Sequence, residues 1–437
     1  MRFGLDFGTS NSALAVEEHG RVRVLPLDPI AGEVLPTVLY VRRDHSTHVG
    51  QAAVEAYLRD NRERDPIRRD FTPLGIRVES SVPGIPPVEA HILTDQAAPG
   101  RFFQALKTFL GDPLVIETNV FGDARGLEEL IAIIFVAVRA RAAALTGHAP
   151  DVITLGRPVR FIGDLAAQER AVGRLRAAAS LAGFREVTFV EEPVAAARAA
   201  GVGAGLTLVF DFGGGTLDLC IVRGGGPLPR AVEILGTAGA DIGGDRITEL
   251  LIAETVAPAL GAGAAWGPKG LTFPRYITNA ISDWHALSAL NERTILDRLD
   301  DLVRLGAPAR EIGALRSAIE LQLGYDIFAL LDGAKRRLSS EAATLVSYHR
   351  AAVDVDARVT RSRFEALLAA TLVRIDRLLD ECLATAGISA SEVDEVVTTG
   401  GSSAIPAVRA LLHRRFPQAR SRDADPFSTV AVGLALS

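Results

Sequence analysis

The pattern of apolar and polar positions occurs twice along this chain. Residues 4–16 read as an apolar segment, a turn of Gly, Thr, Ser and Asn, and a second apolar segment, and residues 209–222 repeat that design about 205 residues later. A third apolar segment follows each pair, at residues 22–25 and 231–235. Short apolar runs separated by Gly-rich turns are typical of hairpins. Each half is therefore predicted to open with a three-stranded antiparallel meander whose first turn is rich in glycine.

Helical and strand patterns alternate between and after these meanders. Helices are predicted at residues 127–144 and 164–182, with a strand at 152–155 between them. After the second meander, helical periodicity dominates residues 246–260 and 276–338, followed by a helix at 365–386, a strand at 395–399 and a helix at 406–416. Such mixing predicts an α/β fold of two lobes around a cleft.

The predicted division assigns each lobe a core and an insert. Lobe I is residues 1–203, with a core of 1–36 and 107–203 and an insert at 37–106. Lobe II is residues 204–416, with a core of 204–245 and 331–416 and a helical insert at 246–330. Residues 417–437 are expected to return to lobe I.

Net charge and cysteine content limit the partners and the cellular compartment that the sequence predicts. A net charge of -6 over 437 residues gives no basic field, so neither nucleic acid nor an anionic membrane is an expected partner. The first ten residues lack the pattern of a secretory signal, and the longest apolar run, residues 130–138, is far below the roughly 20 residues of a membrane span. The two cysteines, Cys220 and Cys382, are isolated in apolar runs, as in a reducing compartment. We expect a cytoplasmic protein.

The two glycine-rich turns are candidates for a phosphate clamp. Glycine allows left-handed backbone angles and lets backbone N–H groups approach phosphate oxygens, and Thr and Ser add hydroxyl donors. Asp6 and Asp211 each end the strand before a turn. A carboxylate beside a polyphosphate needs a cation, which indicates Mg²⁺ held mostly through water. The alternative is that each aspartate only accepts hydrogen bonds from its own turn.

Several segments, in order along nearly the whole chain, resemble the ATPase domain of the 70-kilodalton heat-shock chaperones, the DnaK family of the actin, hexokinase and heat-shock superfamily. The first turn resembles that family's first phosphate loop, and Asp211 to Asp218 its second. The remaining matches are Glu191-Glu192-Pro193-Val194-Ala195-Ala196-Ala197, Gly239-Ala240-Asp241-Ile242-Gly243-Gly244-Asp245, Ala334-Lys335-Arg336-Arg337-Leu338-Ser339-Ser340 and Gly400-Gly401-Ser402-Ser403-Ala404-Ile405-Pro406.

The resemblance implies a two-lobed actin-like ATPase fold with duplicated ribonuclease H-like lobes. It implies Mg²⁺-dependent hydrolysis of ATP to ADP and phosphate, with K⁺ as a further ion. The residues implied as catalytic are Lys107, Glu192, Asp211 and Thr216. Those implied to hold the metal, mostly through water, are Asp6, Asp211, Glu192 and Asp218. Those implied to bind nucleotide are Gly8, Thr9, Ser10, Asn11, Gly213, Gly214, Gly215, Gly243, Gly244, Asp332, Lys335, Arg336, Ser339, Gly400, Gly401 and Ser402.

The use of lysine agrees with these assignments. Only Lys107, Lys269 and Lys335 are lysines among 47 basic residues. In a chain that otherwise uses arginine, a lysine indicates a place where a compact point charge is needed. Two of the three fall on ligand positions of the family. Lys107 would neutralise charge on the transferred phosphate and hold the attacking water in line, the alternative being a surface cation on a helix.

Some positions depart from the family. Ala404 stands where the family has an arginine that covers one face of the adenine, whereas the opposing Arg336 is present. Phe427 replaces an aspartate of the same site, and Thr188 replaces an arginine that engages J-domain proteins. The sequence ends at Ser437, after the helix that closes the ATPase domain, as in truncated DnaK-like proteins of the YegD type. We therefore expect no peptide-binding domain, no cycling on unfolded peptides, and an unidentified protein client or regulator as partner besides adenine nucleotide.

Other functions remain as alternatives. A nucleotide-sensing scaffold or an actin-like filament protein of the same fold would hydrolyse little ATP. A sugar kinase is disfavoured because residues 334–340 match the chaperone type. No His-Arg-Asp loop accompanies the two Asp-Phe-Gly tripeptides, and no Gly-x-x-x-x-Gly-Lys-Ser/Thr sequence occurs, which excludes a protein kinase and an ordinary P-loop. The glycines of residues 201–205 precede their strand, so a hinge is expected there and not a dinucleotide loop.

Overall fold

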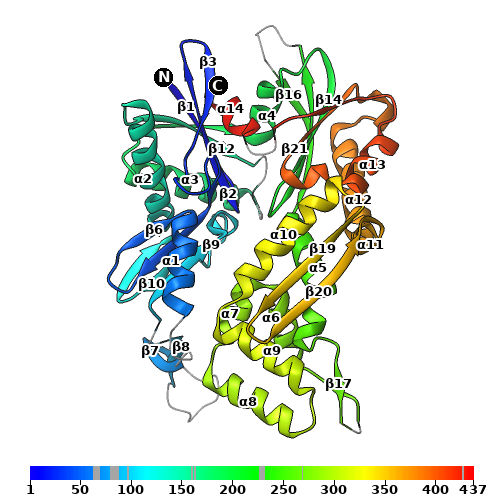
Figure 1. The fold of residues 1–437 in the computed structure, drawn as a ribbon. Helices are drawn as coiled ribbons and strands as arrows, with labels where there is room; N and C mark the ends of the chain where they lie inside the picture. The colour runs from blue at the N-terminus through cyan, green and yellow to red at the C-terminus, as the bar shows by residue number, and fades with distance from the viewer. Residues whose placement is uncertain are drawn as a thin grey trace.

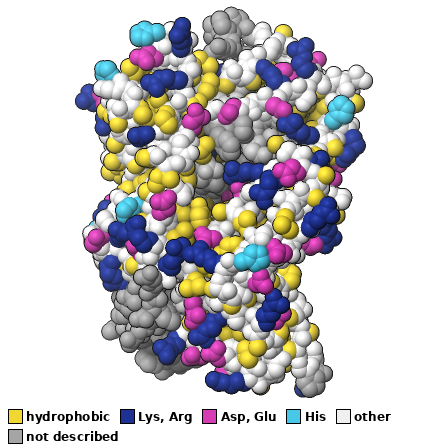
Figure 2. Space-filling view, in the orientation of Figure 1, with side chains coloured by type: hydrophobic (Ala, Val, Ile, Leu, Met, Phe, Trp, Pro, Cys, Tyr) yellow, Lys and Arg dark blue, Asp and Glu magenta, His cyan; other side chains and the backbone are white. Residues whose placement is uncertain are grey.

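The protein is described by a computed structural model that covers residues 1–62, 69–78, 88–95, 98–158, 161, 164–225, 232–267, 269–425 and 428–437. Two lobes stand side by side, each built on a twisted sheet, and the N- and C-termini lie close together at the same end of the molecule (Figure 1). Basic and acidic side chains are interspersed over the face shown in Figure 2.

The first lobe contains the predicted N-terminal meander. Strands β1 (Arg2–Phe7), β2 (Asn11–Glu18) and β3 (Arg21–Leu25) are antiparallel, and β12 (Val152–Arg157) and β13 (Glu186–Glu191) extend the sheet in parallel on the other side of β1. The strand order is β13-β12-β1-β2-β3, with the short β4 (Leu35–Pro36) paired to β2. Asp6 is the last residue but one of β1, so its side chain reaches the turn.

The second lobe repeats this topology. Its strand order is β16-β15-β14-β21-β22, formed by β14 (Gly205–Phe212), β15 (Leu217–Gly224), β16 (Val232–Ala240), β21 (Glu395–Thr399) and β22 (Arg420–Asp423). The meander β14-β15-β16 is antiparallel, and β21 and β22 are parallel to β14. The sequence repeat is therefore a structural duplication, as predicted. Strand β16 extends five residues beyond the predicted end of the third segment.

Helices α2 (Leu127–Thr146) and α3 (Leu165–Leu181) cover the first sheet, within two residues of their predicted bounds. Helices α4 (Glu192–Ala200) and α14 (Thr429–Ala435) lie between the two sheets. Their apolar residues share a core with β14 and β15. The approach is so close that a Cβ on Gly433 would stand 1.8 Å from the carbonyl oxygen of Ala195. Within residues 417–437, α14 packs on β1, whereas β22 still belongs to the second sheet.

The predicted helical insert at 246–330 begins within α5 (Gly244–Thr255) and ends within α10 (Gly324–Ser340). Between them lie η2 (Ala257–Leu260), α6 (Arg275–Ser282), α7 (Trp284–Ala289), α8 (Arg293–Arg304) and α9 (Ala309–Glu320), with a small ladder of β17 (Ala265–Trp266) and β18 (Leu271–Thr272). The antiparallel hairpin of β19 (Ala343–Arg350) and β20 (Val353–Thr360) was not predicted. The single helix expected at 365–386 is two, α11 (Arg361–Leu367) and α12 (Ala369–Ala386). Helix α13 (Pro406–Arg415) follows η3 (Ala390–Glu392) and η4 (Gly401–Ala404).

The insert of the first lobe forms a small sheet with one helix. Strands β5 (Val38–Arg42), β6 (Thr47–Val49) and β9 (Gly100–Gln104) pair in the order β6-β5-β9, and α1 (Gln51–Arg62) packs on them. A separate hairpin is formed by β7 (Arg69–Val78) and β8 (Val88–Asp95). The chain continues through η1 (Leu106–Phe109) to a hairpin of β10 (Glu117–Val120) and β11 (Asp123–Gly126).

An aromatic cluster connects the inserts of the two lobes. The Trp284 ring of α7 lies 6.1 Å from Tyr57 of α1 and 5.7 Å from Phe102 of β9, measured between ring centroids. Tyr325 of α10 stands 5.2 Å from the same indole. These four residues are called the aromatic bridge below. The Trp284 side chain therefore packs across the two lobes.

Candidate functional site

A cavity of about 120 Å³ lies between the lobes. A cavity holds one water above roughly 10–15 Å³, and each water in the liquid occupies about 30 Å³, so this cavity has space for several waters. It is formed by the β1–β2 turn, the β14–β15 turn, η1, the start of α4, the end of β21 and the start of α14. Its lining includes the predicted residues Asp6, Gly8, Thr9, Ser10, Asn11, Lys107, Glu192, Asp211, Gly213, Gly214, Gly215, Thr216, Asp218, Gly400 and Gly401.

The two glycine-rich turns face each other closely. A Cβ on Gly215 would lie 3.3 Å from Thr9 Cγ2, and one on Gly214 would lie 3.2 Å from Ser10 Oγ. Ser10 donates a hydrogen bond across the cleft to Asp245 Oδ2 at 3.2 Å. The two turns are therefore opposed across the cleft, as expected, and Asp245 joins them from α5. The motif at residues 239–245 contained Asp245, but the sequence analysis gave it no role.

The reason for glycine in these turns differs from the one expected. Neither Gly8 nor any of the three glycines at 213–215 has a positive φ, so left-handed angles do not explain them. A Cβ on Gly8 would stand 2.2 Å from the carbonyl oxygen of Asn11, which excludes any side chain there. Close backbone approach, and not backbone handedness, requires glycine at this position.

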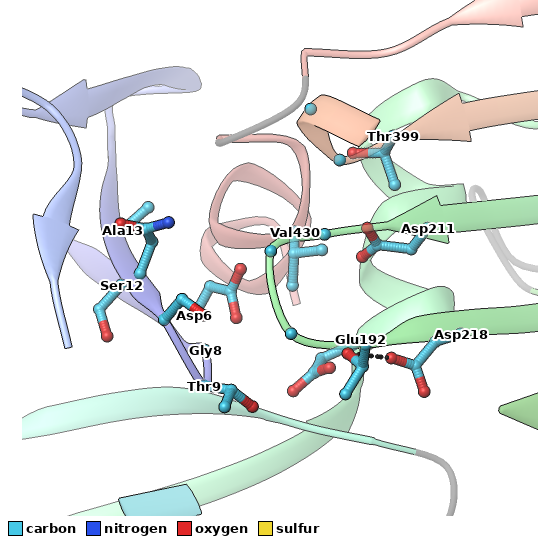
Figure 3. A pocket seen from close by; sticks show the side chains of 18 of the residues that line it. Asp6, Gly8, Thr9, Ser12, Ala13, Glu192, Asp211, Asp218, Thr399 and Val430 are labelled. Atoms are coloured by element: carbon cyan, nitrogen blue, oxygen red, sulfur yellow. Dashed lines mark hydrogen bonds between the residues drawn. The ribbon is translucent and has the colours of Figure 1, made fainter. Parts of the chain in front are cut away.

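Four carboxylates and one amine converge on the cavity. Figure 3 shows Asp6 on one side, Asp211 and Asp218 on the other, and Glu192 between them. The Lys107 ammonium, from η1, lies 2.6 Å from Glu192 Oε1. Residues up to about 210 positions apart in the sequence thus lie together in one cavity. The sequence predicted that these side chains would lie close together.

Burial changes the acidity of this cluster. Loss of hydration, with the nearby Glu192 carboxylate, raises the pKa of Asp6 to about 7. The same causes raise the pKa of Asp218 to about 6, and burial beside Asp218 and Asp6 raises the pKa of Asp211 well above its ordinary value. Burial opposes the charge on Lys107, but Glu192 and Asp6 outweigh it and raise the pKa of the amine. One amine faces four carboxylates, so further positive charge, from protons or a cation, is favoured here.

The hydrogen-bond pattern bears on the alternative role of the aspartates. Within the described residues, neither the Asp6 nor the Asp211 side chain accepts a hydrogen bond from its own turn, so that alternative has no support. Asp218 does accept one, from Thr216 Oγ1 at 2.9 Å. No group of three or more His, Cys, Asp or Glu in the described part of the chain is close enough to bind an ion directly. Binding through water therefore remains the prediction.

The residues predicted to bind the nucleoside lie on α10, outside the cavity lining. The buried Lys335 ammonium donates to the Gly244 carbonyl oxygen at 2.9 Å and to Thr248 Oγ1 at 3.0 Å, and lies 2.7 Å from Asp332 Oδ1. It thereby fixes α10 to the start of α5. Arg336 is exposed and pairs with the other oxygen of Asp332. Ser339 is one turn further along α10.

The remaining predicted loop residues, Gly243, Gly244 and Ser402, pack against the second glycine-rich turn. A Cβ on Gly243 would stand 2.0 Å from the Gly214 carbonyl oxygen, and one on Gly244 would stand 2.5 Å from Ser402 Oγ. Ser402 donates to the Gly213 carbonyl oxygen at 3.0 Å. Thr399 and Thr429 line the cavity but were not predicted, although Thr399 lies next to the predicted Gly400. Phe427 is outside the described residues.

No helix in the described residues is long and apolar enough to cross a membrane.

Comparison with known proteins agrees with the geometry. The family model described as Hsp70 protein matches residues 329–437. The chaperone protein HscA of Pectobacterium carotovorum is 29% identical over 441 residues, covering 99% of this chain and 57% of that protein. The chaperone protein DnaK of Thermus thermophilus is 24% identical over 438 residues, covering 99% of this chain and 60% of DnaK. The chain therefore spans somewhat more than half the length of these relatives.

The similarity to both chaperones extends over 99% of this chain, including both duplicated sheets and the two opposed turns. The chain is similar to these two chaperones, its residues 329–437 match the Hsp70 family model, and it has a two-lobed, actin-like α/β fold.

Proposed function

We propose that the protein binds ATP with Mg²⁺ in this cavity and hydrolyses it to ADP and phosphate. The observation that carries the proposal is a buried lysine ammonium facing a group of carboxylates between two opposed glycine turns. Backbone N–H groups and hydroxyls of such turns suit phosphate oxygens. The likeness to the chaperones HscA and DnaK supports the same activity class.

The chain's own residues divide the work as follows. The Lys107 ammonium neutralises charge that develops on the transferred phosphate, since a fixed donor in a buried site stabilises a charged transition state without reorganising. Glu192, which holds Lys107 at 2.6 Å, orients the attacking water. Thr216 and the first turn bind phosphate oxygens, and the Thr216–Asp218 hydrogen bond fixes the Asp218 carboxylate.

The carboxylates fit a hydrated divalent cation. Hard cations such as Mg²⁺ prefer oxygen ligands and retain several waters. The raised pKa values of Asp6 and Asp218 mark a site where ionised carboxylates lack sufficient counter-charge. Mg²⁺, when bound, would supply positive charge between these carboxylates and the phosphates. K⁺ is a further ion that the family resemblance suggests.

The partners follow from the same proposal. Arg336 and Ser339 on the exposed side of α10 are the residues proposed to contact the adenosine, together with Asp332 and Lys335, whose groups already pair with each other. Opening and closing of the lobes is proposed to be read by an unidentified protein client or regulator.

A nucleotide-sensing scaffold is the second candidate. The aromatic bridge favours it, because contacts between the inserts hold the lobes together independently of any reaction at the phosphates. A scaffold would bind nucleotide tightly and hydrolyse almost none.

Phosphate release at saturating ATP separates the two. We expect release that requires Mg²⁺ and that falls by about a hundredfold in Asp211→Asn, as for loss of one charged group that acts on a phosphoryl transition state. Asp301→Asn, on the exposed face of α8, is the matched control and should behave as wild type. Nucleotide binding without release above the Asp211→Asn level would reject hydrolysis and favour the scaffold.

Ala404→Arg is expected to tighten ATP binding by about twofold to thirtyfold and to restore preference for ATP over GTP. A guanidinium stacked on an aromatic face contributes roughly 0.5 to 2 kcal/mol, depending on desolvation. Calorimetric titration of both nucleotides measures the effect. Ala384→Arg adds the same charge on the exposed surface of α12 and should leave both affinities unchanged. Equal ATP affinity in Ala404→Arg and wild type would show that this position does not face the base.

Trp284→Ala should speed nucleotide release about fivefold to a hundredfold by breaking the aromatic bridge. Each aromatic pair adds roughly 0.5 to 1.5 kcal/mol beyond buried area, and two pairs cross between the inserts. Stopped-flow displacement of a fluorescent ADP measures the rate. Trp266→Phe is the control, because Trp266 packs on Phe273 within one lobe. An unchanged rate in Trp284→Ala would mean that the bridge does not hold the cleft closed.

A further inference from the structure

The segment that carries Lys107 has little regular structure of its own. It starts at Ala105, whose φ of 51° is left-handed, and η1 is only four residues long. Seven residues without helix or strand then lead to β10. Two apolar side chains of this stretch, Leu114 and Ile116, are 87% and 70% exposed. Because 3₁₀ turns have poor hydrogen-bond geometry, the segment needs outside support to hold its shape.

That support comes from helix α3. The Nη1 atom of Arg174 donates to the carbonyl oxygens of Phe109, Leu110 and Asp112 at 3.0–3.2 Å. Its Nη2 atom donates to the carbonyl oxygen of Val115. Arg170, one helical turn earlier, donates to the Gly111 carbonyl oxygen at 2.5 Å. Residues 109–115 are called the Lys107 loop below, and these two side chains bind five of its carbonyl groups.

The two arginines are well placed to act as a fixed support. They stand at i and i+4, hence on one face of α3. The helix is anchored by Asp164, whose side chain caps its N-terminus, and by Ala171 and Leu175, which are buried in the lobe core. Within the described residues, neither arginine forms an ion pair with a carboxylate. Their donors are thus directed to the loop, and the rigid guanidinium fork suits several acceptors at once.

The loop connects directly to the amine in the cavity. The backbone N–H of Leu110 donates to the carbonyl oxygen of Lys107 at 3.3 Å, and the carbonyl of the same Leu110 accepts from Arg174 at 3.0 Å. The Lys107 ammonium itself lies 2.6 Å from Glu192 Oε1. A shift of the loop therefore moves the residue that presents the amine to the phosphate.

We propose that Arg174, assisted by Arg170, is a positioning residue that fixes the Lys107 loop and so sets the place of the Lys107 ammonium. This rests on the proposed ATP hydrolysis for its kinetic consequence. A displacement of about 1 Å at a reacting group can lower a rate up to a hundredfold. Substrate affinity depends on the turns and α10, which Arg174 does not touch.

The test compares Arg174→Met, Arg174→Lys and the matched control Arg176→Met in the full chain. Arg176 is on the same helix but donates to the Val187 carbonyl oxygen, away from the loop. Hydrogen exchange should rise several-fold in the Lys107 loop of Arg174→Met and stay unchanged elsewhere. With ATP, kcat should fall about tenfold to a hundredfold while KM changes less than about twofold. Arg174→Lys keeps the positive charge but loses the forked guanidinium. Its kcat and its loop exchange should lie between those of the wild type and Arg174→Met.

A double variant makes the result specific. In a Lys107→Ala background, Arg174→Met should lower kcat no further, because residues that act through one another are not additive. An equal fractional loss in both backgrounds, or unchanged exchange of the loop in Arg174→Met, would overturn the proposal. Hydrogen exchange does not depend on catalysis. It therefore tests whether Arg174 holds the Lys107 loop in place even if the wild type releases no phosphate. If Arg174→Met unfolds, Arg170→Met removes a single contact and should give a smaller effect of the same pattern.

Discussion

Lys107→Ala should lower the rate of ATP hydrolysis by about a hundredfold and leave nucleotide bound. Removing one preorganised donor from a charged transition state costs on the order of 3 kcal/mol. All three lysines lie in the described part of the chain, and among them Lys107 alone lines the cavity, with its ammonium buried against Glu192. Phosphate release measures turnover, and calorimetry with ADP measures affinity, which should change by no more than a few fold.

The third lysine offers a matched control. Lys269 is exposed in a loop of the helical insert, so Lys269→Ala removes an equal charge far from the cavity and should behave as wild type. A Lys107→Ala protein that retains more than about a third of wild-type turnover would contradict the role given to this amine. So would equal losses of turnover and of ADP affinity, because the residue would then contribute to binding alone.

Asp6→Asn should stabilise the nucleotide-free protein at pH 8 in the absence of divalent ions. Burial raises the pKa of Asp6 from 3.8 to about 7, so the folded state binds this proton more tightly than the unfolded state does. The stability of the wild type then falls as pH rises from about 4 to about 7, and levels off above that. About three pKa units correspond to roughly 4 kcal/mol at most. The asparagine side chain does not ionise, so Asp6→Asn does not lose this stability as the pH rises.

Thermal unfolding in EDTA at pH 5, 6, 7 and 8 measures this effect. The difference in melting temperature between Asp6→Asn and wild type should grow with pH, to several degrees at pH 8. Asp301→Asn, which changes an exposed carboxylate, should follow the wild type at every pH. A constant difference between Asp6→Asn and wild type across the range would mean that Asp6 does not titrate there.

The fold was largely predictable because the strongest signals are local. Each meander consists of short apolar runs around a glycine turn, and Asp6 and Asp211 mark equivalent strand ends. The hairpin of β19 and β20 was missed although its signal was present, since Val353, Val355 and Val359 alternate with polar residues as a half-buried strand requires. The predicted helix at 365–386 passed over the break between α11 and α12, which no proline or glycine marks.

Most of the residues that line the cavity were predictable, but the direction of the side chains on α10 was not. The sequence indicated Lys335 as a nucleotide ligand, but it could not show that the ammonium turns inward to Gly244 and Thr248, because that depends on how α5 packs on α10. Nor could it indicate Arg174, whose carbonyl partners lie about 60 residues earlier in the chain. Side-chain direction across packed elements is a property of tertiary structure, and local pattern does not contain it.

The most direct test of the account is cleavage of ATP in a single turnover. Contacts between the inserts can make product release slow, so steady-state rates would understate the chemical step. Protein in excess over radiolabelled ATP is mixed with Mg²⁺ or EDTA, quenched at intervals and assayed for ADP. We expect wild-type protein with Mg²⁺ to convert all bound ATP, and Lys107→Ala or wild type in EDTA to convert it at least about a hundredfold more slowly. ATP that stays intact on wild-type protein with Mg²⁺, or is cleaved equally fast by Lys107→Ala, would contradict the claim that this cavity hydrolyses ATP.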